Sequence, residues 1–250
     1  MYTVKVAAGK ARDAVRLMEL LWRAPGQEAR TRGPRPGLHV DHLVSTAVAI
    51  ADELGIEQLT IRAVAKRLKV APMSVYTYVP GKSELLLLML DQVFTQMTVS
   101  SPTDDSWRAR VRALADDNHR LYAEHPWLAE LPPNRPPLGP GTLGKYEREL
   151  SVFVGLQLSD LEIDLALTFV LSFVGSCAAT TARARAEVSE SAQTDAEWWT
   201  TQEPALMRVM QNIDQHYPLS SRVGAASAEA QNGTYDAETH YKFGLARVLD

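Results

Sequence analysis

The segment spanning residues 41–84 has the apolar periodicity of three short helices. Its first part, residues 41–54, repeats apolar side chains at intervals of three and four, which places them on one face of a helix. These side chains are Leu43, Ala47, Ile50, Ala51 and Leu54. Gly55 follows, and glycine readily adopts the positive φ that ends a helix. The pattern therefore predicts a helix with one face against a core.

A second helix is predicted over residues 60–68. Thr60 is suited to cap its N-terminus, because a threonine hydroxyl can accept a hydrogen bond from a backbone N–H of the first turn. Ile61, Val64 and Leu68 share one face of this helix. Residues 69–71 then form a tight corner.

The third predicted helix, residues 72–78, is barely two turns long and begins with Pro72, which suits a first helical turn. Such a helix is not stable alone, so Val75 and Val79 should hold it against the first two. Its polar and aromatic side chains are then left at or near the surface. Two helices joined at a steep angle by a short turn form the geometry that enters a DNA major groove. The alternative is a structural three-helix unit that binds nothing.

The remainder of the chain also indicates helices, so the predicted fold class is all-α. We expect a basic extension (1–37), a helix-turn-helix DNA-binding domain (38–84) and a helical ligand-binding and dimerisation domain (85–250). The helices expected after the DNA-binding unit are 82–100, 106–124, 141–156, 160–190, 203–217 and 237–249. Residues 191–203 and 218–237 are predicted to be polar loops.

Composition narrows the setting of the protein. Cys177 is the only cysteine, which excludes an intrachain disulfide and fits a reducing cytoplasm. The longest uncharged run, residues 165–182, reaches the length of a membrane span but contains five Ser and Thr residues. That polarity favours a buried helix, so we expect a cytoplasmic protein without a membrane segment.

Charge is divided unevenly along the chain. Residues 1–82 contain 13 Lys and Arg against 7 Asp and Glu, whereas the remaining residues contain 13 against 23. A basic N-terminal third suggests that this part meets a polyanion. Around the third helix, the basic residues suited to phosphates are Lys66, Arg67, Lys69 and Lys82. In the extension, Arg32 and Arg35 lie in a proline-rich stretch that either enters an A·T-rich minor groove or is a solvated linker.

Catalytic and metal-binding patterns do not stand out. The six histidines form neither an HExxH pattern nor a zinc-ligand spacing, and no glycine-rich nucleotide loop or nucleophile elbow occurs. We therefore expect no cofactor, no metal and no enzyme. An all-helical enzyme acting on a small apolar substrate stays as the alternative from another class.

The DNA-binding segment resembles the signature of the TetR family of bacterial repressors. The resemblance rests on LTIRAVAKRLKVAPMSVYTYVPGKSELL, with its A-x-x-L-x-V turn, its S-x-Y-x-Y-V helix and its P-G-K-S-E continuation. Looser matches in the body are DSW, HPW, RPPLGP and the terminal FGLARVLD. Together they extend the resemblance over nearly all of residues 38–250, and residues 1–37 fall outside it.

The resemblance implies a ligand-responsive repressor that binds double-stranded operator DNA as a homodimer, or an activator or nucleoid-binding protein with the same DNA contacts. A palindromic operator calls for two-fold symmetry, and the dimer surface is expected on residues 161–182 and the C-terminal helix. The residues expected to hold phosphates or the DNA backbone are Thr60, Arg62, Tyr76 and Lys82. Those expected to approach base edges are Pro72, Met73, Ser74, Thr77 and Tyr78.

The resemblance also implies a pocket for a small apolar or aromatic effector, lined by helices within 83–100, 106–124 and 160–180. The candidate lining residues are Met97, Thr98, Asn118, Tyr122, Trp127 and Phe173. For each of them, packing in the core explains the residue type equally well. The operator sequence and the effector's identity do not follow from the chain.

Overall fold

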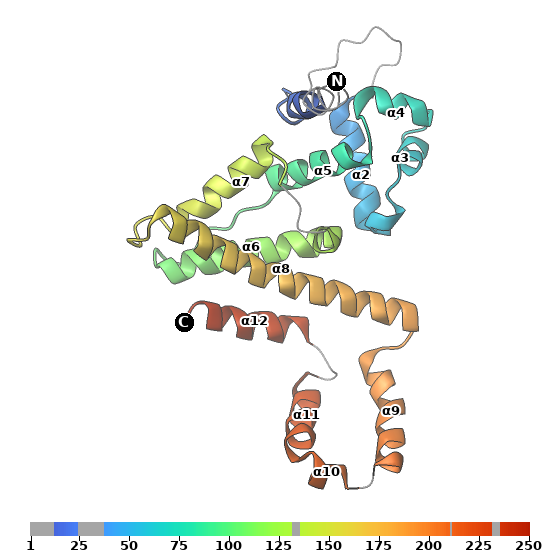
Figure 1. Ribbon diagram of the computed structural model, residues 1–250, viewed down its shortest axis with the longest axis vertical. Coiled ribbons are helices and arrows are strands. Elements are labelled where there is room, and N and C mark those ends of the chain that lie inside the picture. Colours follow the sequence, from blue (N-terminus) through green and yellow to red (C-terminus); the bar gives the residue numbers. More distant parts are fainter. Residues whose placement is uncertain (1–12, 25–37, 132–135, 211, 232–235) are drawn as a thin grey trace, which may run out of the picture. The chain divides into compact units, whose positions relative to one another are not determined.

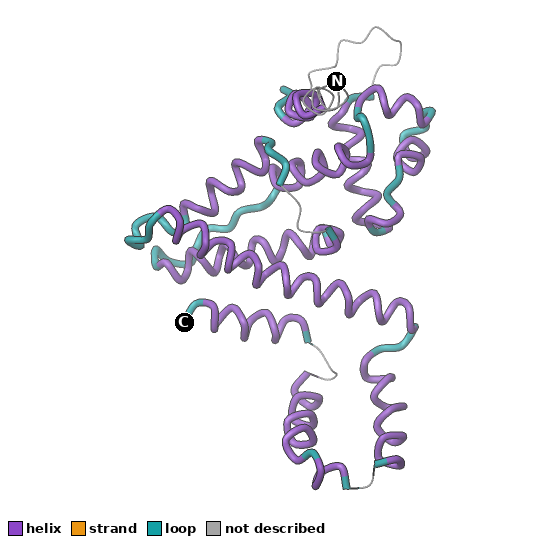
Figure 2. The backbone as a smooth tube through the Cα atoms, in the orientation of Figure 1, coloured by secondary structure: helices purple, strands orange, loops and turns teal. Residues whose placement is uncertain are grey.

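The computed structural model describes residues 13–24, 38–131, 136–210, 212–231 and 236–250 (Figure 1). All regular secondary structure in these residues is helical, as Figure 2 shows, which confirms the all-α prediction. The chain separates into two compact units, Met1–Leu167 and Thr168–Asp250. The long helix α8, Asp160–Ser191, belongs to both units.

The other elements follow one another through short connections. In the first unit they are α2 (Val40–Leu54), η1 (Ile56–Gln58), α3 (Ile61–Arg67), α4 (Pro72–Tyr78), α5 (Lys82–Gln96), α6 (Trp107–Glu124), η2 (Pro126–Glu130) and α7 (Pro140–Ser151). In the second they are α9 (Asp195–Val209), α10 (Ile213–His216), α11 (Pro218–Gln231) and α12 (Ala237–Val248). Residues 13–21 are also helical.

Local signals in the sequence explain the boundaries of α3 and α4. The Thr60 hydroxyl accepts a 3.0 Å hydrogen bond from the Ala63 N–H, so Thr60 caps α3 as predicted. Pro72 occupies the first turn of α4, and Val79 ends that helix in an extended conformation. The helix-turn-helix boundaries expected from the sequence are thus confirmed.

The corner between α3 and α4 is closed by a Schellman motif. The Val70 N–H bonds to the Ala65 carbonyl at 3.0 Å, and the Lys69 N–H bonds to the Lys66 carbonyl at 3.2 Å. Lys69 has a φ of 56°, in the left-handed region that glycine usually occupies at this position. The turn therefore contains a lysine in a conformation that costs backbone energy.

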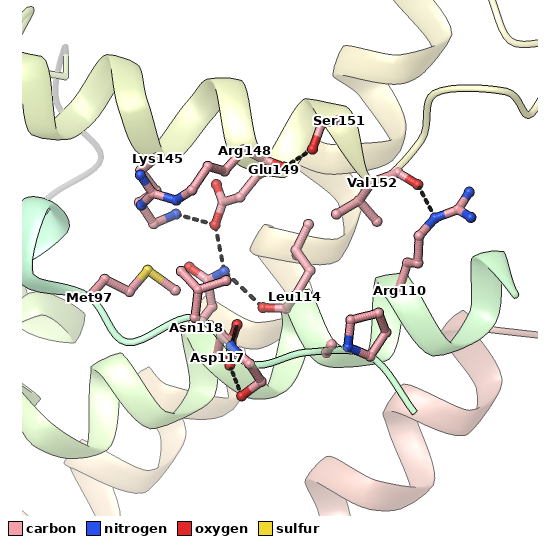
Figure 3. A pocket seen from close by; sticks show the side chains of 14 residues that line it. Met97, Arg110, Leu114, Asp117, Asn118, Lys145, Arg148, Glu149, Ser151 and Val152 are labelled. Carbon is pink, nitrogen blue, oxygen red and sulfur yellow. Dashed lines mark hydrogen bonds and ion pairs between the residues drawn. The ribbon is translucent and has the colours of Figure 1, made fainter. Parts of the chain in front are cut away.

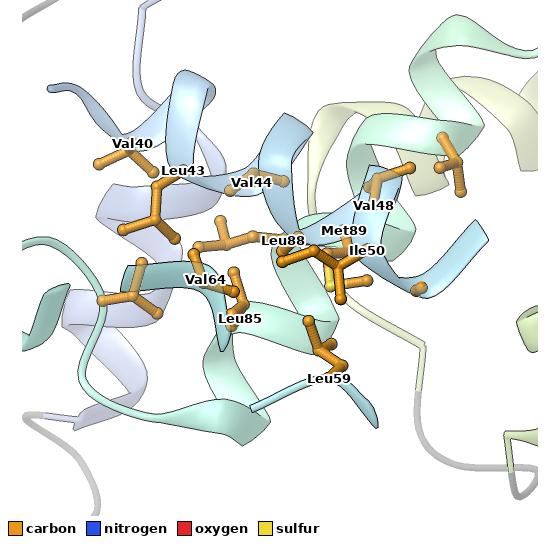
Figure 4. Close-up of a cluster of buried hydrophobic side chains, with 14 of the residues drawn as sticks. Val40, Leu43, Val44, Val48, Ile50, Leu59, Val64, Leu85, Leu88 and Met89 are labelled. Carbon is orange, nitrogen blue, oxygen red and sulfur yellow. The ribbon is translucent and has the colours of Figure 1, made fainter. Parts of the chain in front are cut away.

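A continuous apolar core joins α2, α3, α4 and α5 (Figure 4). Its fully buried side chains include Leu43, Val44, Leu59, Val64, Val75, Leu85, Leu88 and Met89. The short helix α4 contributes Val75, and Val79 follows it, both with no exposed surface. This packing stabilises a helix that is too short to persist alone.

The helix at residues 13–21 also packs on this core. Leu21 is 3% exposed and belongs to the core, and Leu17 and Met18 pack against it. Beyond the helix, the Trp22 indole N–H donates a 2.9 Å hydrogen bond to the Leu138 carbonyl. Arg23 forms an ion pair with Asp41 at the start of α2. The helix therefore belongs to the first unit, although it precedes the segment that carries the family resemblance.

Helices α5 and α7 approach each other closely at two glycines. The buried Asp91 carboxylate on α5 accepts hydrogen bonds from the Thr142 N–H at 2.8 Å and the Thr142 hydroxyl at 3.1 Å. This places an anion at the N-terminus of α7, where the helix dipole favours it. A Cβ at Gly139 or Gly141 would overlap Asp91, so only glycine permits the contact.

In the second unit, the buried residues of α8 are Val170, Val174 and Ala178. Phe173 on α8 stacks on Tyr241 of α12, with ring centroids 6.0 Å apart. Gly244 lies so close to the Phe173 ring that a Cβ would overlap it. These contacts hold α12 against α8.

Four predicted segments differ from the structure. The expected loops 191–203 and 218–237 contain most of the helices α9 and α11. Helix α9 starts at a capping box formed by Thr194 and Glu197, and α11 is rich in alanine, which favours helix regardless of polarity. Helices α5 and α7 end earlier than expected, at Gln96 and Ser151. After α5 the chain is extended, because the Ser100 N–H bonds to the Asp117 carboxylate rather than to a preceding turn.

Helix α8 is long and apolar enough to cross a bilayer by length and composition alone, with a mean hydropathy of 1.7 in its most apolar window. A mostly buried core helix of a soluble protein passes the same test, but only 17% of this window is buried, so the expectation of a buried helix is wrong for the described residues. Its first three turns expose Leu161, Leu165 and Phe169, which are spaced four residues apart and so share one face.

Candidate nucleic-acid interface and effector cavity

Helix α4 presents most of its side chains to solvent. Met73 is 74% exposed and Tyr76 is 43% exposed, and Pro72 and Thr77 are exposed beside them. Ser74 is half-buried. Tyr78 is also half-buried and packs against the apolar core. The helix is anchored on one side and offers a mixed apolar, hydroxyl and aromatic surface on the other.

Cationic side chains surround α4, but they are not equivalent. Arg62, Lys66, Lys69 and Lys82 are exposed. Arg67 instead makes a two-pronged ion pair with Glu53, with N–O distances of 2.9 and 2.6 Å. The hydrogen bond from Arg67 lowers the pKa of Glu53, and the same bond raises the pKa of Arg67. Arg67 thus fixes α3 to α2. Arg32 and Arg35 lie outside the described residues.

A cavity of about 170 Å³ lies between α6, α7 and the extended segment 97–102 (Figure 3). Much of its wall is apolar, formed by Met97, Val99, Pro102, Ala113, Leu114 and Val152. Concave apolar surfaces with a few polar groups are typical sites for small molecules.

One side of the cavity carries a buried polar cluster. The Oε1 atom of Glu149 accepts hydrogen bonds from Lys145 Nζ and Asn118 Nδ2, each at 2.6 Å. Asn118 Nδ2 also donates to the Leu114 carbonyl at 2.9 Å. All three polar residues are less than 10% exposed. Burial lowers the pKa of Lys145, and the neighbouring Glu149 carboxylate opposes that shift.

Asp117 and Arg110 of α6 also line the cavity. Asp117 accepts hydrogen bonds from the Ser100 N–H at 2.9 Å, the Ser100 hydroxyl at 2.6 Å and Arg120 at 2.6 Å. These bonds attach the segment after α5 to α6. Arg110 donates to the Val152 carbonyl at 3.0 Å and the Asp105 carbonyl at 2.8 Å.

The structure brings only some of the predicted effector residues to this cavity. Met97 and Asn118 line it, whereas Thr98, Tyr122 and Trp127 do not. Trp127 is 1% exposed in the apolar core, and Tyr122 packs against that core, where burial raises its pKa. Phe173 belongs to the second unit and stacks on Tyr241. Residues 160–180, expected as a third wall, contribute no lining residue.

Sequence reasoning missed the charged residues of the wall. Lys145 and Glu149 are spaced four apart, a signal that predicts a pair on one helix face. Their burial could not be inferred, since it depends on α6 packing over α7. Arg110 and Arg148 likewise resemble ordinary surface cations in the sequence.

The fold and the exposed surface of α4 define a helical DNA-binding regulator. Residues 43–89 match the model of the bacterial regulatory proteins of the tetR family, and residues 100–250 match the tetracyclin repressor-like C-terminal domain. The chain belongs to the TetR family of transcriptional regulators.

Individual proteins show the same relationship. The transcriptional repressor DrrR1 of Streptomyces coeruleorubidus is 36% identical over 241 residues, which cover 95% of this chain and 85% of that protein. The repressor Rv1353c of Mycobacterium tuberculosis is 30% identical over 144 residues, 54% of each chain.

Solved structures share the fold. The regulator SCO7222 of Streptomyces coelicolor, 26% identical, superposes with a TM-score of 0.60 over 85% of this chain and 96% of that one. ActR from the same organism, solved in complex with actinorhodin, is 23% identical, with a TM-score of 0.64 over 86% and 95% of the two chains. The present chain is thus a DNA-binding transcriptional regulator.

Proposed function

We propose that this protein is a homodimeric repressor that binds a palindromic operator through α4 and is released when a small molecule occupies the cavity of the first unit. The observation that carries the proposal is that α4 has one buried face and one exposed face. Val75 and its neighbour Val79 are fully buried, while Met73, Tyr76 and Thr77 are exposed. The relatives named as repressors support repression rather than activation.

On DNA, the exposed groups have distinct chemistry. Arg62 and Lys82 suit phosphates, and the Thr60 hydroxyl, which accepts from Ala63, still has its own proton to donate. Met73 and Thr77 can contact thymine methyl groups, and Ser74 can donate or accept at a base edge. We place Pro72 at the groove, Tyr76 on the DNA backbone and Tyr78, which is half-buried, at the edge of the contact. The DNA-binding domain accordingly spans residues 38–84, and residues 85–250 form the ligand-binding and dimerisation domain.

The dimer is proposed from the apolar face of α8. Leu161, Leu165 and Phe169 are each more than half exposed along one stripe, which water would otherwise cover. A second copy is the partner that a two-fold operator requires. With its apolar face covered in this way, the regulator is a cytoplasmic protein rather than a membrane one.

The path from cavity to DNA is proposed to run through α7 and α5. An effector contacts Lys145 and Glu149 on α7, and the Asp91 contact joins the N-terminus of that helix to α5. Helix α5 begins at Lys82, four residues after α4 ends. The effector relieves repression only to the extent that it binds the DNA-free conformation more tightly.

Selection of DNA fragments by the purified full-length protein tests this function. We expect enrichment of a palindromic sequence and loss of its binding in Tyr76→Ala. Tyr217→Ala is the matched control, because Tyr217 is an exposed tyrosine of the second unit. Absence of any enriched sequence, or equal effects of the two substitutions, would refute the proposal.

A further inference from the structure

The charged residues around the cavity are unevenly paired. Lys145 and Glu149 neutralise each other at 2.6 Å, and Arg120 neutralises Asp117 at 2.6 Å. Two further cations line the cavity, Arg110 on α6 and Arg148 on α7. Among the described residues, neither of them forms an ion pair.

The groups around the two arginines do not neutralise their positive charges. Arg110 is held in place by backbone carbonyls of Val152 and Asp105, which orient its guanidinium but carry no full negative charge. Arg148 extends along α7 beside Lys145, another cation (Figure 3). The wall therefore has a surplus of positive charge on both helices that enclose an apolar space.

We infer that the effector is an amphipathic anion. A carboxylate or similar acidic group meets either Arg148 or Arg110, which lie at opposite ends of the wall in Figure 3, while an apolar body fills the space beside Met97, Leu114 and Val152. This inference rests on the proposed function, which assigns the cavity to the effector. Arginine is suited to the task, because its guanidinium can bind a carboxylate with two parallel hydrogen bonds.

Other ligand classes fit the wall less well. A cationic ligand would approach three lining cations, while both lining carboxylates already accept hydrogen bonds from neighbours. A wholly apolar ligand would remove water from the half-buried Arg110 without supplying a counter-charge, which is unfavourable. An acidic group instead compensates the charge that the protein leaves unpaired.

Matched pairs of probes that differ only in charge test the inference. We would titrate the full-length protein with 2-naphthoate and 2-naphthamide, and with decanoate and decanamide, at low ionic strength by calorimetry. At least one acid should bind about tenfold or more tightly than its amide, the factor expected for a charge-assisted hydrogen bond. The preference should shrink as salt is added.

Variants assign the preference to the cavity. At least one of Arg148→Met and Arg110→Met should reduce the acid-to-amide ratio several-fold. If Arg110 is that residue, Arg110→Lys should retain more of the ratio than Arg110→Met. The matched control is Arg112→Met, which removes the same charge from an exposed position of α6 outside the cavity wall. Circular dichroism would verify that each variant folds.

Two results would overturn the inference. One is that no acid in the panel binds more tightly than its amide. The other is an acid preference that survives in the Arg110→Met/Arg148→Met double variant. Either result concerns ligand chemistry alone, because operator selection is measured without ligand and reports separately on the proposed function.

Discussion

The Trp127 indole N–H donates a 2.7 Å hydrogen bond to Asp52 Oδ1, which links η2 to α2 across 75 residues of sequence. His125 Nδ1 lies 2.8 Å from the same oxygen, so one carboxylate joins two rings of the segment that follows α6. Helix α6 carries part of the cavity wall, and α2 is the first helix of the DNA-binding segment. The Asp52 carboxylate therefore connects α2 to the segment that follows α6.

Removing the indole donor should weaken this connection. We expect Trp127→Phe to lower the free energy of unfolding by about 2–4 kcal/mol, since a hydrogen bond to a charged acceptor is lost and the smaller ring leaves a cavity at a fully buried position. Urea denaturation measures the change. Trp107→Phe, at the start of α6 and only half-buried, is the control and should cost less. Equal losses would show that the Asp52 bond contributes nothing specific.

The contact between α5 and α7 should not tolerate a side chain at Gly141. We predict that Gly141→Ala destabilises the protein by about 2–3 kcal/mol, because the new Cβ overlaps the backbone of Asp91 and the helices must separate. Gly144→Ala in the same helix should instead stabilise it by up to about 1 kcal/mol, since only the flexible Arg148 tip is near. Thermal unfolding of both variants checks the prediction, which a destabilised Gly144→Ala would contradict.

The left-handed lysine of the turn offers a stabilising substitution. Lys69→Gly should raise the free energy of unfolding by about 1 kcal/mol, because glycine adopts a φ of 56° without strain. Lys66→Gly removes the same charge from the last turn of α3 and should destabilise by up to about 1 kcal/mol. Denaturant titration distinguishes them, and a loss of stability in Lys69→Gly would argue against the left-handed turn.

The salt dependence of operator binding should distinguish cations that contact DNA phosphates from cations that are paired within the protein. Lys82→Ala should lower the slope of log K against log salt by about one, the amount expected for one phosphate contact. Arg67→Ala should change the slope less, because Arg67 is already paired with Glu53. Fluorescence anisotropy over a potassium chloride series measures both. Identical slopes for the two variants would place Arg67 on a phosphate.

The buried pair of the cavity predicts a non-additive response. Lys145→Met should cost about 3–5 kcal/mol by leaving the Glu149 carboxylate buried without its cation, while Lys145→Met with Glu149→Leu should recover most of that loss. A double-mutant cycle in urea measures the coupling. If the two losses simply added, the pair would not be interacting.

The Lys145–Glu149 pair also determines the direction in which folding stability changes with pH. The pKa of Lys145 is lower in the folded chain, so the unfolded chain keeps the proton to higher pH. Between the folded pKa and the ordinary value of 10.5, raising the pH therefore favours folding through this group. Compared with the double variant, the wild type should lose less stability as pH rises through that window.

Much of the DNA-binding segment could be predicted, because its signals are local. Thr60 caps α3 through a hydrogen bond three residues away, and Pro72 sets the start of α4 by its own ring. The burial of Val75 and Val79 follows from helical spacing. By contrast, the ion pair that occupies Arg67 depends on Glu53, 14 residues earlier on another helix.

The cavity was harder to predict for the same reason. Its wall combines α6 with α7, and the Asn118–Glu149 bond crosses 31 residues. Helix α11 was missed because its alanine-rich sequence lacks an apolar stripe. Helix α9 was missed although Thr194 and Glu197 have the spacing of a capping box. The side chains of the cavity wall could be placed only with the tertiary structure.

The glycine contact at Asp91 has a consequence for altering the inducer. Arg110, Arg148 and the apolar lining can be replaced without touching Gly139 or Gly141, which lie about one turn or more from the cavity residues of α7. Under the proposed function, ligand selectivity and signal transmission would rest on different residues. A library restricted to the wall could yield sensors for new compounds that still control the original promoter.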